Sequence, residues 1–202
     1  MHDSIYCYQN SDVLKNKLDI RDKRLLLQAE IEYTTIQLMD LQHHPIDGNF
    51  DFNHLCSIHK HIFQDLYDWA GKPRTVNISK GNLFCLTQNI ASYADFIFAN
   101  YYLDCVAAKN DEKQFIRQLT THYADLNALH PFREGNGRSQ REFARELCLE
   151  CGYVFDLTQI THEEMLNASI KAFNVDNREL ERIFMQHIKP ISTYKRHQKQ
   201  SY

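Results

Sequence analysis

Residues 130–141 constrain the fold more than any other part of the sequence. They read His-Pro-Phe-Arg-Glu-Gly-Asn-Gly-Arg-Ser-Gln-Arg and lie between two stretches with helical periodicity. Proline disfavours the α-helical backbone for the residue before it, so the upstream helix should end at His130. The glycines on either side of Asn136 permit a tight turn before the downstream helix. The segment therefore predicts a helix–loop–helix unit with His130 at the end of its first helix.

Both flanking helices carry an apolar stripe. Upstream, from a start near residues 110–111, one face is formed by Phe115, Leu119, Tyr123, Leu126 and His130. Downstream, the buried face is formed by Phe143, Ala144, Leu147, Cys148 and Cys151. Another face of this second helix carries Arg138, Arg141 and Arg145, at spacings of three and four residues.

The residue types between the two helices suit a nucleotide phosphate. A helix C-terminus favours the protonated form of His130, and the glycines can expose backbone N–H groups at the positive end of the next helix dipole. The carboxylate of Glu134 can hold a divalent cation, and the arginines can bind phosphate oxygens. Spacing alone favours a glycine-rich turn followed by a solvated arginine face. The acid, the amide and the glycines packed between histidine and arginines favour the phosphate site.

Composition and charge limit the other possibilities. The 202 residues are enough for one buried core, and 43% hydrophobic with 24% charged residues is typical of a soluble globular protein. There is no apolar run of about 20 residues and no signal segment, so we expect a cytoplasmic protein without membrane spans. We predict one domain over residues 1–190 and a basic tail over residues 191–202. A net charge of −3 argues against a DNA-binding protein.

Cysteine and histidine chemistry is a weaker alternative. The six cysteines do not form a spaced disulfide framework, and Cys148 and Cys151 fall on an apolar helix side, which indicates buried structural thiols. Among the histidines, His54, His59 and His61 are the best metal candidates, yet one helix face cannot present all three. There is also no P-loop motif.

The rest of the chain is mostly helical by its periodicity. We predict further helices over residues 19–40, 54–69, 92–102, 161–173 and 178–188, with Thr161 and Asn177 as N-caps. Residues 75–87 differ, because apolar residues surround a polar Ser-Lys-Gly-Asn stretch. This pattern predicts a short β-hairpin that turns at Gly81-Asn82.

Residues 130–141 resemble the signature of the Fic family, His-x-Phe-x-(Asp/Glu)-Gly-Asn-Gly-Arg-x-x-Arg. Every specified position matches: His130, Phe132, Glu134, Gly135, Asn136, Gly137, Arg138 and Arg141. Residues 59–63, 67–71, 74–81 and 84–85 also resemble the helix and flap that precede this motif in family members. The resemblance implies an all-α fold, a helical bundle with a short β-hairpin flap over the active site. The core would be about residues 50–185 and the flap about residues 75–87.

The resemblance implies transfer of AMP from ATP to a hydroxyl side chain of a target protein. His130 would be the base and Glu134 would hold Mg²⁺, while Phe132 would be a core anchor. The anion hole would be formed by Gly135, Asn136 and Gly137, and the β- and γ-phosphates would be bound by Arg138 and Arg141. In the flap, Lys80 and Gly81 would register an extended target segment and cover the nucleotide, although an ordinary surface hairpin is the alternative.

The motif also bears on the transferred group and on regulation. Family members that transfer phosphate replace the second glycine, and Gly137 is intact, which favours AMP, although UMP or GMP stays open. Many members carry an inhibitory (Ser/Thr)-x-x-x-Glu helix, and no Ser or Thr here has a Glu four residues on. We therefore expect a small antitoxin that supplies a glutamate to Arg141, and a toxin acting on DNA gyrase or topoisomerase IV. The alternative from another class is a non-enzymatic binding module.

Overall fold

The computed structural model describes residues 3–193, and most of them are helical. The elements in chain order are α1 (Lys23–His43), α2 (Phe52–Phe63), β1 (Ser79–Lys80), β2 (Asn82–Leu83), the 3-10 turn η1 (Thr87–Asn89), α3 (Ile90–Phe98), α4 (Tyr101–Ala108), α5 (Glu112–Leu129), α6 (Asn136–Glu150), β3 (Tyr153–Phe155), α7 (His162–Phe173), α8 (Arg178–His187) and β4 (Ile188–Pro190). The predicted class, a helical bundle with a short β-hairpin, is confirmed.

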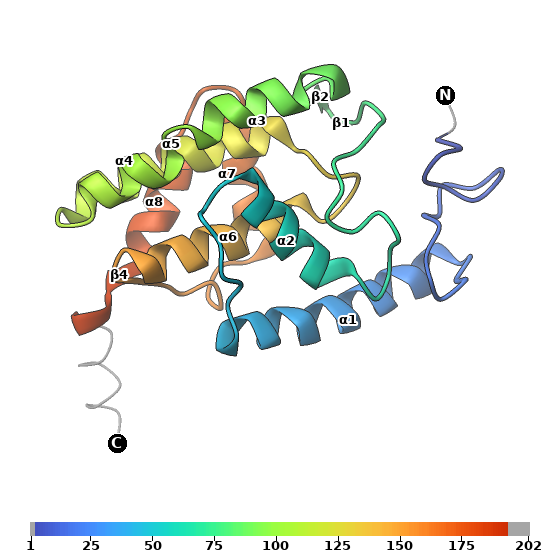
Figure 1. Ribbon diagram of the computed structural model, residues 1–202, viewed down its shortest axis with the longest axis horizontal. Helices are drawn as coiled ribbons and strands as arrows, with labels where there is room; N and C mark the ends of the chain where they lie inside the picture. Colours follow the sequence, from blue (N-terminus) through green and yellow to red (C-terminus); the bar gives the residue numbers. More distant parts are fainter. Residues whose placement is uncertain (1–2, 194–202) are drawn as a thin grey trace.

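Helix α5 is the centre of the bundle. It packs against α3, α4, α6, α7 and α8, and Figure 1 shows it running between the helices on either side. Its predicted stripe is buried, with Phe115, Leu119 and Leu126 fully inaccessible. Helix α1 lies along one side of the bundle, where it packs on α2 (Figure 1). One continuous core extends from Leu41 to Ile188.

Side-chain caps explain where several helices begin. The carboxylates of Asp22, Asp51 and Asp111 accept backbone N–H groups at the starts of α1, α2 and α5. Thr161 forms a reciprocal capping box with Glu164, as its position predicts. Asn177 is the N-cap residue of α8, as predicted, but its side chain makes no cap bond.

Three predicted helices differ from the structure by more than one residue at an end. Helix α1 begins at Lys23 and extends to His43. The helix predicted over residues 54–69 ends at Phe63, where the N–H groups of Leu66 and Tyr67 both donate to the Phe63 carbonyl. The chain turns there because Tyr67 sends its hydroxyl to Glu30 in α1. Residues 92–102 are divided between α3 and α4, with a break at residues 99–100.

The predicted hairpin is present. Ser79 pairs with Leu83 and Lys80 with Asn82, so Gly81 alone, at φ 84°, makes the turn that we placed at Gly81-Asn82. A second antiparallel pair joins β3 to β4 and was not predicted. The helix expected up to residue 188 therefore ends one residue early, at His187. Strands of three residues are too short to show an alternating pattern.

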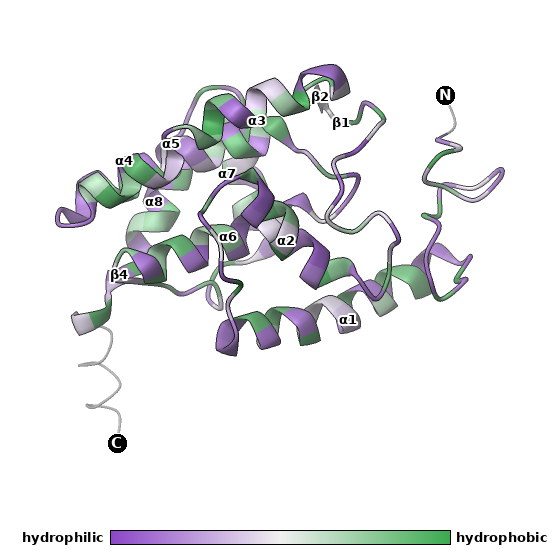
Figure 2. Cartoon of the chain, viewed as in Figure 1, coloured by the Kyte–Doolittle hydropathy of each residue, from purple (hydrophilic) through white to green (hydrophobic). Residues whose placement is uncertain are grey.

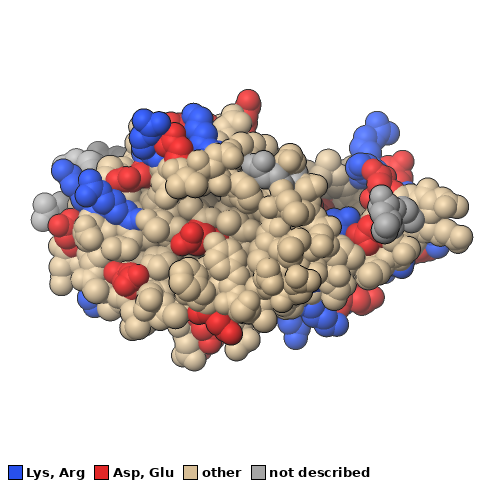
Figure 3. Space-filling model, turned by 90° about the horizontal axis from the view of Figure 1, so that it is seen from above, with Lys and Arg blue, Asp and Glu red and all other residues tan. Residues whose placement is uncertain are grey.

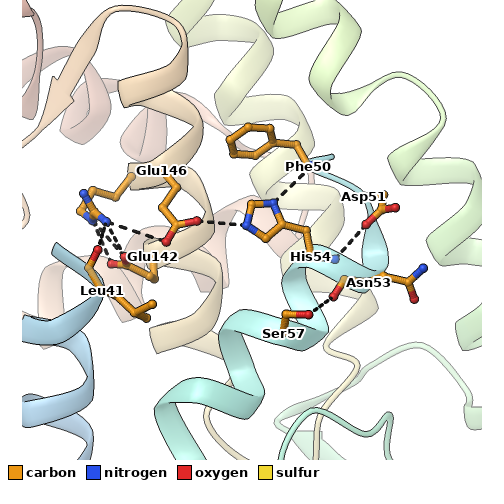
Figure 4. A network of polar contacts seen from close by, with 9 residues as sticks. Leu41, Phe50, Asp51, Asn53, His54, Ser57, Glu142 and Glu146 are labelled. Carbon is orange, nitrogen blue, oxygen red and sulfur yellow. Dashed lines mark hydrogen bonds and ion pairs between the residues drawn. The ribbon is translucent and has the colours of Figure 1, made fainter. Parts of the chain in front are cut away.

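A buried polar network joins three helices (Figure 4). Nε2 of His54 in α2 lies 3.1 Å from Oε2 of Glu146 in α6. Arg145 donates to both carboxylate oxygens of Glu142 and, at 3.1 Å, to the Leu41 carbonyl at the end of α1. Buried charges are tolerated when they are paired in this way. The alternative of a solvated arginine face thus does not hold for Arg145, which is buried.

The surface is mixed in character. Apolar and polar residues alternate along α1 in Figure 2, and Leu25, Ile31, Ile36 and Met39 of this helix are more than half exposed. Charged side chains are scattered around a mainly uncharged centre on the face seen in Figure 3. Within residues 3–193, none of the helices is long and apolar enough to cross a bilayer.

Candidate active site

His130 ends α5 in a left-handed conformation, at φ 46° and ψ 61°. Its Nδ1 lies 3.2 Å from the carbonyl oxygen of Asn127. Since a carbonyl can only accept a hydrogen bond, Nδ1 carries the proton and Nε2 is the nitrogen that can take up another one. The side chain is largely buried, with 9% of the residue exposed. His130 is thus held in the tautomer that a general base requires.

The loop after His130 is fixed by its own side chains. Asn136 accepts from the Phe132 N–H and donates to the Phe132 carbonyl, both at 2.8 Å. The Phe132 ring is fully buried and stacks on His59 with 3.8 Å between ring centroids. These contacts place Phe132 in the core, as the resemblance implies, and they leave Asn136 to act on an anion through its backbone.

Two residues of α2 pack against the loop between His130 and α6. His59 sends Nε2 to the Glu134 carbonyl at 3.0 Å, and its Nδ1 accepts the Gly71 N–H at 2.8 Å. Phe63 lies directly under Gly135, where a Cβ atom would come within 2.2 Å of the Phe63 ring. Gly135 also has φ 80°, which glycine adopts at little cost. The loop therefore needs glycine here for backbone shape and for space.

Helix α6 starts at Asn136 with Gly135 as its N-cap, and glycine has no side chain with which to cap the helix. The N–H groups of a first helical turn have no partner within the helix, and the positive end of the dipole lies there. Glu134 precedes this turn and turns Oε1 back to the Gly135 N–H at 2.9 Å. The geometry can accept a phosphate on the helix terminus with a carboxylate beside it.

The two motif arginines lie on different sides of this helix start. Arg141 reaches back to the first turn, where its Nη1 would lie 3.1 Å from a Cβ built on Gly137. Arg138 turns towards α1, where it donates to Glu30 and to Thr34 and lies over the Phe63 ring. The structure thus brings the predicted residues of the motif together around one helix terminus.

The flap is anchored to the motif by a buried arginine. Arg74 is 2% exposed and donates Nε to the His130 carbonyl at 2.9 Å and Nη2 to the Cys85 carbonyl at 2.5 Å. From the flap, Phe84 stacks on the His130 ring with 3.8 Å between centroids. Gly81 forms the exposed tip of the hairpin. The side chain of Lys80 lies outside the described part of the structure, so its predicted role stays a prediction.

An open groove lies between the flap region and α3. It has a volume of about 610 Å³ and is lined by Leu83, Phe84 and Leu86 of the flap region and by Tyr93 and Phe96 of α3, among others. Phe84 thus lines this groove and also stacks on His130.

Four contacts around the motif were not predicted as site features: those of Glu30, His59, Arg74 and Phe84. One of them left a signal in the sequence. Glu30 falls on the same helical face as Leu26 and Thr34, and all three are buried. An acid on the buried stripe of a helix requires a partner. The other three act through contacts that no local pattern reveals.

Several known proteins have sequences similar to this chain. The family model described as Fic/DOC family matches residues 49–148. The protein adenylyltransferase VbhT of Bartonella schoenbuchensis is 38% identical over 83% of this chain, which spans only 35% of that protein. The "Probable protein adenylyltransferase y4lH" of Sinorhizobium fredii is 36% identical over 84% of this chain and 88% of its own length.

Solved structures agree with the sequence comparisons. The BepC effector of Bartonella tribocorum with bound AMPPNP superimposes with a TM-score of 0.84 at 23% identity, over 92% of this chain and 96% of that one. The N-terminal Fic domain of a Bartonella quintana effector with bound ADP gives 0.83 at 28% identity, over 92% and 94%. One relative is 36% identical over most of its own length, and the solved Fic domains share the fold of this chain. This chain therefore belongs to the Fic/DOC family.

Proposed function

We propose that this protein is an adenylyltransferase that moves AMP from ATP to a hydroxyl side chain of a target protein. One observation carries the proposal. His130, in the tautomer that leaves Nε2 as the base, stands at the end of α5. The loop after Phe132 leads through Glu134 to the start of α6, where the N-cap residue is Gly135. A base and an anion site are thus held by one short, rigid loop.

The reaction follows from this juxtaposition. The target hydroxyl oxygen attacks the α-phosphorus, and His130 Nε2 takes the hydroxyl proton. The bond between the α-phosphorus and the oxygen bridging to the β-phosphate breaks, and pyrophosphate leaves. The N–H groups of Gly137 and its neighbours at the start of α6, together with Arg138 and Arg141, would bind the phosphate oxygens and orient the α-phosphate for in-line attack.

A magnesium ion fits this site by the chemistry of its donors. Residues 3–193 contain no group of three or more His, Cys, Asp or Glu side chains that could hold a metal ion. Mg²⁺ in phosphoryl-transfer sites uses one or two carboxylates and takes its other ligands from phosphate and water. Glu134, half-buried and oriented by the Gly135 N–H, would be that carboxylate. The ion would neutralise charge on the triphosphate.

The related proteins support the same activity. Four relatives at 30–38% identity carry the name protein adenylyltransferase, three of them marked as probable. The Bartonella quintana domain, at 28% identity, holds ADP. These names and that ligand are the support for ATP as the substrate here.

Transfer can be tested with labelled nucleotide. The purified chain is incubated with Mg²⁺, a bacterial lysate and ATP labelled at the α- or the γ-phosphate, with His130→Ala as the control. We expect label on a protein from α-labelled ATP only, and none with the variant. Label from γ-labelled ATP only would indicate a kinase. No label from either ATP would favour another nucleotide, a missing target or a non-enzymatic binding module.

We further propose that the protein acts in the bacterial cytoplasm as the toxin of a toxin–antitoxin pair, with DNA gyrase or topoisomerase IV as its target. The support is the sequence, which lacks the (Ser/Thr)-x-x-x-Glu pattern that would inhibit it in cis. An antitoxin glutamate would then reach Arg141. Adding purified gyrase to the α-labelled reaction tests the target: a labelled gyrase subunit supports the proposal, and unlabelled gyrase beside another labelled protein contradicts it.

A further inference from the structure

The first motif arginine is held by a helix far from it in the sequence. Arg138 Nη2 donates to Oε1 of Glu30 in α1 at 2.5 Å, and Nη1 donates to the Thr34 hydroxyl at 3.2 Å. Phe63 supports the guanidinium from below, with Cζ 4.7 Å from the ring centroid. Glu30 and Thr34 lie outside residues 49–148, the segment that the family model matches. Helix α1 therefore contributes directly to the motif.

Glu30 is itself fixed in place. The residue is 7% exposed, and its second oxygen, Oε2, accepts the Tyr67 hydroxyl at 2.5 Å. Burial, followed by the charge of Glu30, raises the pKa of the Tyr67 phenol, so this hydroxyl stays a donor. A buried carboxylate with both oxygens bonded has one orientation. It can therefore set the orientation of the arginine that it binds.

The bonds to α1 leave some N–H groups of the Arg138 guanidinium available for a ligand. A guanidinium has five N–H donors, and the bonds to Glu30 and Thr34 use two of them. Arg138 is also in the first turn of α6, beside the N–H groups that would bind a phosphate. The remaining donors can thus bind an anion while the other edge is held by α1.

We propose that Glu30 is a positioning residue for Arg138, which fixes the guanidinium so that its remaining N–H groups bind the β- and γ-phosphates of ATP. This inference rests on the proposed function, because it requires a triphosphate at the start of α6. The opposite role would be competition, in which Glu30 occupies Arg138 and weakens ATP binding. The two roles predict opposite signs for the effect of removing the carboxylate.

The test is nucleotide binding to the full chain by calorimetry, with Mg²⁺ and either AMPPNP or AMP. The variant is Glu30→Gln, whose side chain has one oxygen, so only one of Tyr67 and Arg138 keeps its acceptor. We expect AMPPNP to bind about tenfold more weakly and AMP, which lacks the β- and γ-phosphates, to bind as in the wild type. The matched control is Glu32→Gln, an exposed position on the same helix whose carboxylate accepts a hydrogen bond from Gln28. It should change neither affinity.

Every other outcome overturns the inference. Unchanged AMPPNP binding would mean that Glu30 does not position Arg138, and tighter binding would make Glu30 a competitor of phosphate. Equal weakening of AMPPNP and AMP would indicate a merely structural role. If Glu30→Gln does not fold, Tyr67→Phe, which releases Glu30 on one side, should weaken AMPPNP alone by about threefold.

The same experiment separates this inference from the proposed function. If the wild type and Glu30→Gln both bind AMPPNP equally well while Arg138→Ala does not bind it, only the role of Glu30 is contradicted. A wild-type chain that does not bind AMPPNP contradicts both, because Arg138 would have no triphosphate to bind.

Discussion

At the scale of single residues, the site depends on neutral and small groups as much as on charged ones. His59 is fully buried between Phe63 and Phe132 and uses both ring nitrogens to hold backbone at Gly71 and Glu134. Burial lowers its pKa from 6.5 to about 4, although the bond to the Glu134 carbonyl acts in the other direction. The motif loop thus rests on a histidine that must stay neutral.

The neutral state of His59 makes the fold sensitive to acid. Below pH 6.5 an unfolded chain protonates this histidine, while the folded chain does not until about pH 4. Stability should therefore fall by about 3 kcal/mol from this group as pH drops through that window. In urea unfolding at pH 7 and pH 4, we expect the stability difference between wild type and His59→Gln to shrink by that amount. The exposed His43→Gln should follow the wild type at both pH values, and a constant difference for His59→Gln would show that its ring does not stay neutral.

Gly135 tests how much the loop depends on space. Alanine there must adopt φ 80° and also place Cβ 2.2 Å from Phe63, whereas Gly152 has φ 88° with nothing within 4 Å of its Cβ position. We expect Gly152→Ala to cost about 1 kcal/mol and Gly135→Ala about 3 kcal/mol in thermal unfolding, because only the second adds overpacking. Equal costs would mean that the backbone conformation alone selects glycine.

At the scale of elements, the flap is joined to the helices by backbone contacts. The Arg74 N–H donates to the Pro131 carbonyl, and the Cys85 N–H donates to the Ala128 carbonyl. The Arg74 side chain adds bonds to the carbonyls of His130, Val76 and Cys85. The base of the hairpin is therefore tied to the end of α5 and to the motif loop, while its tip at Gly81 is exposed.

Replacing the arginine should release the hairpin. Arg74→Lys keeps the charge, but one ammonium cannot replace a planar group that bonds three separate carbonyls. We expect a loss of about 2 kcal/mol and faster tryptic cleavage after Lys80, followed by mass spectrometry of the fragments. Arg178→Lys is the matched control, because that side chain is exposed and pairs with Asp176 on the surface. Unchanged cleavage would show that the backbone bonds alone hold the flap.

Sequence periodicity predicted elements well where local signals agree. Residues 111 and 161 have capping side chains, and α5 and α7 begin directly after them. Periodicity failed where a contact with a distant part of the chain determines the local structure. Beyond the end of α2 at Phe63, Tyr67 bonds to Glu30, and β4 forms because β3 lies beside it. Neither event leaves a local pattern of polar and apolar residues.

At the scale of the whole molecule, the same division holds for the candidate site. The residues of positions 130–141 are contiguous, so a motif could predict them together. Glu30 and Arg138 are joined only after α1 packs on the bundle, and Phe84 meets His130 only after the flap folds back. Contacts of this kind depend on the assembled core, which periodicity does not describe.

The network of Figure 4 shows that the core also holds charge, because Arg145 joins α1 to α6 through the Leu41 carbonyl and Glu142. Burial raises the pKa of Glu142, and Arg145 opposes that rise. Arg145→Met should cost about 3–5 kcal/mol at pH 8, since it leaves a buried carboxylate without its cation. In this variant Glu142 would bind a proton at higher pH in the folded chain than in the unfolded chain. The stability of the variant therefore falls as pH rises above about 4.5, and the stability lost through Arg145→Met should be smaller at pH 5 than at pH 8. Adding Glu142→Gln should restore part of the stability in urea unfolding, whereas a loss independent of pH would assign the effect to packing.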